Sequence, residues 1–218
     1  MGGTAAIAAL IDGCDMFGME NWSMITHMNE IWEGLIAEVF PLMKTGAEKP
    51  FAFFDLADPE KRTREDIARA MKLIGNFGDK FKTILGLNEK ELYEIAGVMK
   101  VSIDESAAPA EKFRKAVAEL YEALGVYCLV VHPTKEAACC VSGEYFQTDG
   151  PYCENPVLTT GAGDNFNAGF CLGMTLGLDP LSALTLGVST SGFYVRNAKS
   201  PTFDEVIGFV ENWDAGMI

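Results

Sequence analysis

The segment TTGAGDNFNAGF, residues 159–170, is the stretch of the sequence that decides the fold. It places the small residues Gly161 to Gly163 directly before a predicted helix whose apolar face includes Phe166, Phe170 and Leu172. The first N–H groups of a helix have no acceptor within the helix, and the helix dipole makes that end positive. Glycines also let the backbone approach a bound group closely and adopt a positive φ. The segment therefore predicts a turn and helix start that bind an anion such as a phosphoryl group.

Asp164 falls in the first turn of this predicted helix. A carboxylate at that position can accept the proton of an attacking hydroxyl group, which is the role of the base in phosphoryl transfer. A glycine turn followed by Asp is also a common way to begin a helix, so GAGD alone leaves a purely structural interpretation open. We expect Asp164 to be the catalytic base and Gly161, Ala162 and Gly163 to form an anion hole.

The longer string resembles the C-terminal signature of the ribokinase-like, or PfkB-family, carbohydrate kinases, which reads DTTGAGDxFxAGF. Asn88-Glu89-Lys90-Glu91 looks like the NxxE motif of that family, and FFDLADPEKR, residues 53–62, resembles its strand-end D-x-N-x-R region. The order of these motifs along the chain also fits the family. Read alone, Asn88 is a good helix N-cap with Glu91 as its partner at the third helical position, and this interpretation stays open.

The resemblance implies ATP-dependent transfer of a phosphoryl group to a hydroxymethyl group of a sugar or nucleoside, with ATP and Mg²⁺ as cofactors. It implies magnesium near Asn88 and Glu91, held through water, and oxygen ligands suit such a hard cation. The ATP-binding residues that it implies are Thr160, Thr134, Val188, Ser191 and Gly192.

Three alternatives to a sugar kinase stay open at this point. One is a catalytically incompetent nucleotide-binding or assembly module, and another is a kinase of vitamin precursors, which share the ribokinase fold. A dinucleotide oxidoreductase is disfavoured, because no GxGxxG follows a first strand.

The chain departs from the family pattern at two places. Residues 131–136, VHPTKE, occupy the position of the T-x-G-x-x-G turn near the ATP phosphates but lack its glycines. Leu158 stands where family members commonly have an Asp that helps to bind a monovalent cation, which argues against potassium activation. His132, at a predicted strand end, is interpreted as a histidine satisfied by the backbone, and neither it nor His27 is assigned a role.

Strand and helix patterns alternate along the chain, which predicts an α/β fold: a three-layer α/β/α sandwich with a mostly parallel central sheet, ribokinase-like and truncated at the N-terminus. Strands are predicted at 15–19, where a short buried strand is expected, and at 51–54, 83–85 and 126–131, with a hairpin at 136–147 that turns at Ser142-Gly143. Helices are predicted at 4–11, 28–39, 63–77, after Asn88, and at 108–124, 163–177, 179–194 and 203–214.

We expect residues 1–218 to form a single but partial ribokinase-like kinase domain. Family members usually carry an N-terminal third that supplies the first strands, a small β-sheet lid and most sugar contacts, and the chain shows no such region. A truncated protein and a shortened relative are both compatible with this pattern. Lost strands would expose a sheet edge that a partner chain could cover, so a homodimer is one expectation.

Composition excludes several classes of partner. Acidic residues outnumber basic ones by 31 to 17, giving a net charge of −14 that repels nucleic acid and anionic membranes. Six cysteines without a CxxC pattern indicate reduced thiols rather than a zinc site. The apolar N-terminus lacks a basic region and is too short to span a bilayer. The expected protein is cytoplasmic and acts on a small molecule.

Overall fold

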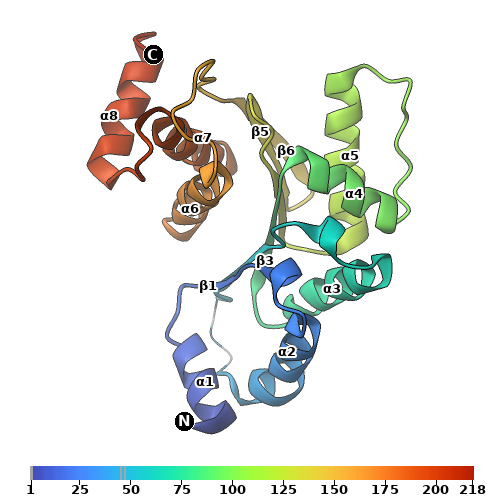
Figure 1. Ribbon diagram of the computed structural model, residues 1–218. Helices are drawn as coiled ribbons and strands as arrows, with labels where there is room; N and C mark the ends of the chain where they lie inside the picture. Colours follow the sequence, from blue (N-terminus) through green and yellow to red (C-terminus); the bar gives the residue numbers. More distant parts are fainter. Residues whose placement is uncertain (1, 45, 47) are drawn as a thin grey trace. The chain divides into compact units, whose positions relative to one another are not determined.

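The computed structural model describes residues 2–44, 46 and 48–218 (Figure 1). Its contacts divide into two compact units, which we describe separately. The N-terminal unit runs to Leu129 and includes Cys140–Gly143, and the C-terminal unit comprises Val130–Cys139 and Glu144–Ile218. The expectation of a single domain stays a prediction. Six strands hydrogen-bond in chain order, β1 to β6, and the predicted α/β class with a mostly parallel sheet is confirmed.

The sheet of the N-terminal unit is built from parallel strands. β1 (Met16–Met19) pairs with β2 (Phe51–Asp55), and β2 pairs with β3 (Lys82–Leu87). β2 and β3 are almost continuously apolar and buried, as strands covered on both faces are. The strand predicted at 15–19 is confirmed as β1, but its expected burial is wrong, because β1 is the end strand and only Met19 within it is buried.

Two helices of the N-terminal unit have ends that their residue types define. Thr63 accepts a hydrogen bond from the Asp66 N–H at the start of α3, and Gly125, with φ of +64°, ends α5. Phe77 of α3 is fully buried and meets Phe40, Phe54 and Trp32 edge to face, which forms an aromatic core. The helices are α1 (Gly3–Ile11), α2 (Met28–Gly34), α3 (Arg64–Phe77), α4 (Glu89–Val98) and α5 (Pro109–Leu124).

The single helix predicted at 28–39 is interrupted in the structure. α2 ends at Gly34, a π-helical turn covers Leu35–Val39, and a 3₁₀ turn that contains Pro41 covers Phe40–Leu42. Proline removes one backbone donor and crowds the preceding turn, which accounts for the loss of regular α-helix ahead of it. Ile31 is 48% exposed, whereas Trp32 is fully buried.

The C-terminal unit contains the end of β4 and the first four residues of β5, together with β6 and three helices. The two-residue turn between β5 and β6 has positive φ at both Ser142 and Gly143, which is the geometry of an antiparallel hairpin and confirms that prediction. The elements are β4 (Cys128–Val131), β5 (Glu136–Val141), β6 (Glu144–Asp149), α6 (Ala162–Thr175), α7 (Pro180–Asn197) and α8 (Phe203–Asp214).

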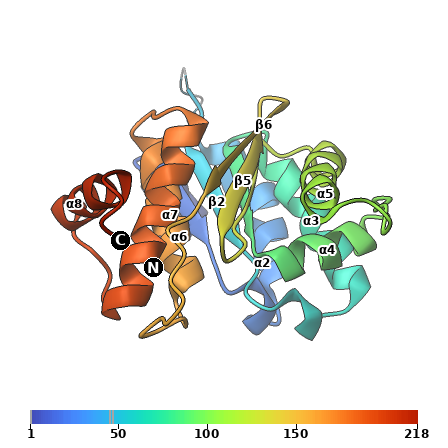
Figure 2. The ribbon, with the colours of Figure 1, turned by 90° about the horizontal axis from the view of Figure 1, so that it is seen from above.

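α6 and α7 lie side by side because glycines line their contact (Figure 2). A Cβ on Gly169 would come within 2.5 Å of the Thr190 hydroxyl oxygen, and one on Gly173 within 2.8 Å of the Ala183 Cα. A Cβ on Gly187 would meet the Phe166 ring at 2.8 Å. The two helices therefore pack at backbone distance, which holds the N-terminus of α6 against α7.

The cysteines and the apolar character of the helices bear on the class of the protein. None of the six cysteines, all of which the structure describes, is in a disulfide, and Cys128, Cys139 and Cys171 are buried. Within the described part of the chain, no helix combines the length and the apolar character that crossing a membrane requires.

Candidate functional site

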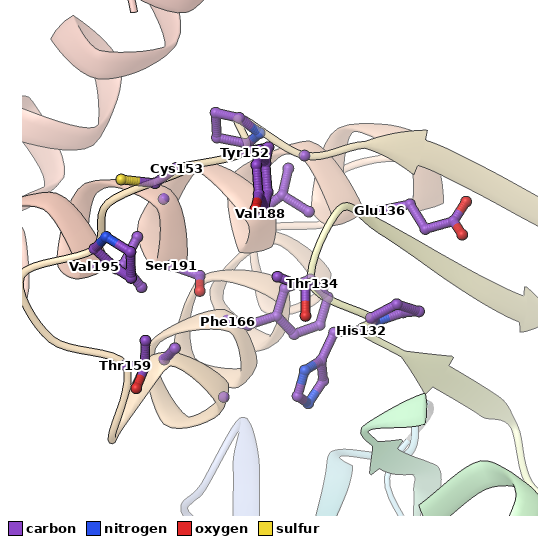
Figure 3. A pocket seen from close by; sticks show the side chains of 17 residues that line it. His132, Thr134, Glu136, Tyr152, Cys153, Thr159, Phe166, Val188, Ser191 and Val195 are labelled. Atoms are coloured by element: carbon purple, nitrogen blue, oxygen red, sulfur yellow. The ribbon is translucent and has the colours of Figure 1, made fainter. Parts of the chain in front are cut away.

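A cavity of about 310 Å³ lies within the C-terminal unit, at the first turn of α6 (Figure 3). Four segments line it: the loop after β4, the segment 150–159 that leads to α6, the first turn of α6, and α7. This volume is at the lower end of the range found for small-molecule sites. Because every lining residue belongs to the C-terminal unit, the cavity is a property of that unit alone.

The first turn of α6 has the geometry that the sequence predicts. The Ala162 N–H donates to the Thr159 carbonyl at 3.0 Å, and the Asn165 N–H and amide group donate to the Gly161 carbonyl at 3.1 and 2.8 Å. The N–H groups of Gly163 and Asp164 lie between these donors, where a helix offers no acceptor. The predicted turn and helix start are thus confirmed, and the role as an anion hole stays a prediction.

The two glycines of GAGD are required for different reasons. Gly161 has φ of +91°, and a Cβ there would lie 2.8 Å from the Tyr194 hydroxyl oxygen, which donates to the Thr160 carbonyl at 2.7 Å. Gly163 has helical backbone geometry instead. A Cβ on Gly163 would lie 3.2 Å from Cε1 of His132, so glycine leaves room for the imidazole.

The predicted site residues of the C-terminal unit are only partly gathered at the cavity. Thr134, Val188, Ser191 and Gly192 line it together with Ala162 and Gly163. Thr160, Gly161 and Asp164 are not among its lining residues, and Asp164 is exposed on the first turn of α6.

The segment Gly150–Leu158, which we name the strap, is the part of the cavity wall that sequence reasoning missed. Its residues Pro151, Tyr152, Cys153 and Pro156 line the cavity, as does Val195 of α7. The strap has no helical or strand-like periodicity, so the only signal in its sequence is the pair of prolines within it, Pro151 and Pro156.

Hydrogen bonds from α7 hold the strap in place. Arg196 donates through Nη1 to the Pro151 carbonyl and through Nη2 to the Tyr152 carbonyl, both at 2.9 Å. The Val157 N–H donates to the Val195 carbonyl at 2.8 Å. The guanidinium of Arg196 also lies over the Phe209 ring of α8 at 5.5 Å. The position of the cavity wall is therefore fixed by successive residues of α7.

His132 lies in the cavity wall, on the side of the α6 turn. Its ring centroid is 4.7 Å from that of Phe166, and Figure 3 shows the two residues together with Thr134. Burial lowers the pKa of His132 to about 4, although a hydrogen bond with its own main chain acts in the opposite direction. The imidazole is therefore neutral at pH 7, in agreement with the sequence-based interpretation of a backbone-satisfied histidine.

Asn88 and Glu91 lie in the N-terminal unit, where they form a reciprocal capping box at the start of α4. The Asn88 side chain accepts from the Glu91 N–H at 3.0 Å, and the Glu91 carboxylate accepts from the Asn88 N–H at 2.9 Å. Burial raises the pKa of Glu91 to about 7, the Asn88 N–H opposes this rise, and the carboxylates of Asp55 and Asp58 add to it. The capping interpretation is confirmed, and the magnesium role stays a prediction.

The arginine of the D-x-N-x-R-like segment has a structural role. Arg62 donates to the carbonyls of Trp22, Ile25 and Thr26 and lies over the Trp22 ring at 4.6 Å. Asp55, at the end of β2, accepts from the Ala57 N–H at 2.7 Å. Among the residues that the structure describes, no group of three or more His, Cys, Asp or Glu side chains is arranged to hold a metal ion.

Comparison with known proteins identifies the family. Residues 2–213 match the family model described as prokaryotic ketohexokinase. The chain belongs to the prokaryotic ketohexokinase family. The ketohexokinase of Haloferax volcanii is 27% identical over 211 residues, which cover 97% of this chain and 54% of that protein. The chain thus spans about half the length of this curated ketohexokinase.

Solved structures place this ketohexokinase-family chain in the ribokinase fold. Thermotoga maritima ribokinase aligns with a TM-score of 0.66 at 20% identity, covering 94% of this chain and 59% of that one. Arabidopsis thaliana ribokinase, solved with ribose and ATP, aligns at 0.67 and 19%, covering 94% and 59%. Xylella fastidiosa fructokinase, solved with ATP, aligns at 0.68 and 14%, covering 94% and 64%. The predicted resemblance to ribokinase-like carbohydrate kinases is confirmed.

Proposed function

We propose that this chain carries the nucleotide site of an ATP-dependent sugar kinase, which transfers the γ-phosphoryl group of ATP to a hydroxymethyl group of a ketohexose or a related sugar or nucleoside. The observation that carries the proposal is the cavity at the first turn of α6, where an apolar recess adjoins backbone donors. Family membership supports the sugar as acceptor, and the ATP bound by two structural neighbours supports the donor.

The composition of the cavity wall suits an adenine nucleotide. Apolar surface that can contact a flat base is provided by Val188, Val195, Pro151 and Pro156. Ligand sites obtain most of their affinity from such apolar surface. A few polar groups, among them the Ser191 hydroxyl, can fix the orientation of base and ribose. The family resemblance implies that Val188, Ser191 and Gly192 bind ATP, and this is consistent with their common place in the cavity wall.

The first turn of α6 provides the chemistry of the proposed transfer. The sugar hydroxyl oxygen attacks the γ-phosphorus as the bond to the β-phosphate oxygen breaks, and Asp164 accepts the hydroxyl proton, leaving ADP and the sugar phosphate. The N–H groups of Gly163 and Asp164, which have no acceptor within the helix, and the helix dipole stabilise the negative charge that spreads over the transferring group. These donors are fixed by the helix and do not reorganise during the step.

The residues at the start of α4 fit a hydrated magnesium ion. Asn88 and Glu91 supply oxygen atoms, and the buried Glu91 carboxylate lies among other carboxylates that a cation would stabilise. One Glu91 oxygen is engaged by the Asn88 N–H, which favours contact with the ion through water. When bound, magnesium neutralises part of the charge of the nucleotide phosphates.

Turnover and nucleotide binding, measured side by side, test the proposal. The chain is expected to bind a non-hydrolysable ATP analogue in calorimetric titration and to release ADP when given ATP, magnesium and fructose. Asp164→Asn is expected to lower the rate about 10²–10⁴-fold while analogue affinity is kept, because it removes the base alone. Asp204→Asn is the matched control, since Asp204 also lies exposed in the first turn of a helix of the same unit.

Each outcome separates the open alternatives. Equal turnover in the Asp164→Asn and Asp204→Asn variants would eliminate Asp164 as the base. Binding of the analogue without turnover of any sugar would favour the incompetent nucleotide-binding module, and turnover of hydroxymethylpyrimidine or pyridoxal alone would favour a vitamin-precursor kinase. The cytoplasmic location and the homodimer expected from the sequence stay predictions.

A further inference from the structure

His132 is a cavity residue that the proposed phosphoryl transfer does not use. It stands at the end of β4, in the loop whose sequence lacks the glycines of the family turn. Its ring lies beside Phe166, with centroids 4.7 Å apart and planes 33° apart (Figure 3). A Cβ built on Gly163 would lie 3.2 Å from the Cε1 atom of this ring. The imidazole is thus held between an aromatic support and the turn that is proposed to bind phosphate.

The orientation of the ring leaves one nitrogen for a ligand. The hydrogen bond of the imidazole is with its own main chain, and in the described part of the chain no other residue bonds to the ring. The atoms nearest to a Cβ built on Gly163 are Cε1 at 3.2 Å and Nε2 at 3.8 Å, so the Nε2 edge faces the first turn of α6. That turn is also where the N–H groups of Gly163 and Asp164 lack a helical acceptor.

We propose that His132 is a phosphate ligand: its Nε2 donates a hydrogen bond to the phosphate chain of the nucleotide bound at the first turn of α6, and the imidazole takes up one proton as the nucleotide binds. This inference rests on the proposed function. The proton comes from solvent and adds to the Nε2 lone pair, and no other bond is made or broken.

The electrostatics of the loop make this proton uptake feasible. Without a ligand the imidazole is neutral at pH 7, since burial lowers the pKa of His132 to about 4. One unit of negative charge about 4 Å away, with the screening usual near a protein surface, raises proton affinity by roughly a thousandfold. Phosphate at the turn is therefore sufficient to bring the imidazole to half protonation near neutral pH.

The other charged groups around His132 come from each neighbouring element. Lys135 follows it in the same loop, with its ammonium 4.8 Å from the centroid of the Tyr152 ring of the strap, and opposes protonation. Glu136 begins β5 and lines the cavity, and Asp164 lies in the first turn of α6. Cys153 of the strap is the remaining titratable group of the cavity wall besides Tyr152.

Two amide substitutions separate the nitrogen atoms of the ring. The amide nitrogen of Gln at position 132 falls near Nε2, whereas that of Asn falls near Nδ1, and both variants keep a polar side chain beside Phe166. We expect His132→Asn to bind a non-hydrolysable ATP analogue about 10- to 100-fold more weakly than the unmodified chain, which is the value of a hydrogen bond to a charged group. His132→Gln is expected to retain most of the affinity, and all three proteins are expected to bind adenosine equally.

Calorimetry in buffers of different ionisation enthalpy measures the proton uptake directly. At pH 6.5 the unmodified chain is expected to take up more protons per bound analogue than His132→Gln. The terminal phosphate of the nucleotide also has a pKa near 6, but its own proton uptake is the same in both proteins and is removed when the two values are subtracted. His27→Gln is the matched control, because His27 is the only other histidine and its side chain is 82% exposed.

The results distinguish this inference from the proposed function. Tight analogue binding with the same affinity and proton count in His132→Asn as in the unmodified chain would overturn the role of His132 and leave the nucleotide site standing. Equal weakening of adenosine and analogue would show that His132 only supports the fold of the cavity, which also overturns the inference. No binding of either ligand by the unmodified chain would overturn both.

Discussion

Glu91 is the residue at which local structure and proposed chemistry use the same side chain. It caps the start of α4, yet it is only 8% exposed and lies near Asp55 and Asp58. Burial raises its pKa to about 7, so the folded protein holds a proton that the unfolded chain releases at lower pH. Between the ordinary value of 4.5 and about 7, the free energy of unfolding therefore falls as pH rises.

Glu91→Gln should remove this part of the pH dependence. Glutamine can still accept from the Asn88 N–H, and it carries no charge to bury. Above pH 7 we expect the variant to be more stable than the unmodified chain, by an amount on the order of 2–3 kcal/mol. Urea unfolding at pH 5, 6, 7 and 8 measures this.

If Glu91 also contacts magnesium, the variant needs more magnesium for half-maximal turnover, and an unchanged requirement contradicts that role.

Glu205→Gln is the matched control for the capping box. Thr202 and Glu205 form the same reciprocal pair at the start of α8. The hydrogen bond from Lys199 and that from the Thr202 N–H hold the pKa of Glu205 below its ordinary value, so its contribution is present at neutral pH and is lost as pH falls. Glu205→Gln should thus leave the free energy of unfolding between pH 5 and 7 almost unchanged. A gain in stability as large as that of Glu91→Gln would contradict our account of Glu91.

Single residues show which parts of the site the sequence can predict. The spacing of Asn88 and Glu91 is enough to predict a capping box, because that interaction is local. The raised pKa of Glu91 comes first from burial and then from Asp55 and Asp58, which are more than thirty positions away, so spacing cannot predict it. Gly163 is similar: the reason for its glycine is His132, which only the fold brings against it.

At the scale of elements, the strap depends on α7 for its position. Arg196 bonds to two successive strap carbonyls, and we expect Arg196→Ala to weaken adenosine binding about tenfold and to lower the free energy of unfolding by about 1–3 kcal/mol. Arg196→Lys keeps the charge but cannot span both carbonyls, so it should resemble the alanine variant. Calorimetric titration with adenosine and urea unfolding measure the two effects.

Lys199→Ala provides the control for Arg196. Lys199 is also basic and lies close by, but its partner is the surface carboxylate of Glu205, and exposed ion pairs contribute little. We expect adenosine affinity to be unchanged in this variant. Adenosine binding by Arg196→Ala at the affinity of the unmodified chain would show that the strap holds its position without α7.

The elements that the sequence predicted well begin or end at residues of a type that favours a helix cap or a turn. α3 begins at the Thr63 cap, α5 ends at Gly125, and the hairpin turns at Ser142-Gly143, and each boundary lies where its residue types require it. The helix expected at 28–39 has no such signal at Gly34, where it becomes a π-helical turn. The strap could not be predicted, since its conformation comes from Arg196 and Val195, more than thirty positions further along the chain.

At the scale of the whole molecule, the chain matches about half of a longer ketohexokinase but contains the complete cavity within one compact unit. Ligand binding stabilises the segments whose opening would disrupt its site, by about 2.7 kcal/mol at a ligand concentration one hundred times the Kd. The part of the molecule that a nucleotide stabilises therefore shows where its site lies.

Hydrogen exchange with and without a non-hydrolysable ATP analogue, in metal-free buffer, measures this distribution. We expect amide exchange to slow up to about a hundredfold in the loop after β4, in the strap and in residues 188–195 of α7, because these segments line the cavity. Peptides from α1 to α5 serve as the internal control and should exchange at unchanged rates. Slowing of equal size in both units would mean that the analogue stabilises the molecule globally, and slowing confined to the N-terminal unit would place the nucleotide away from the α6 turn.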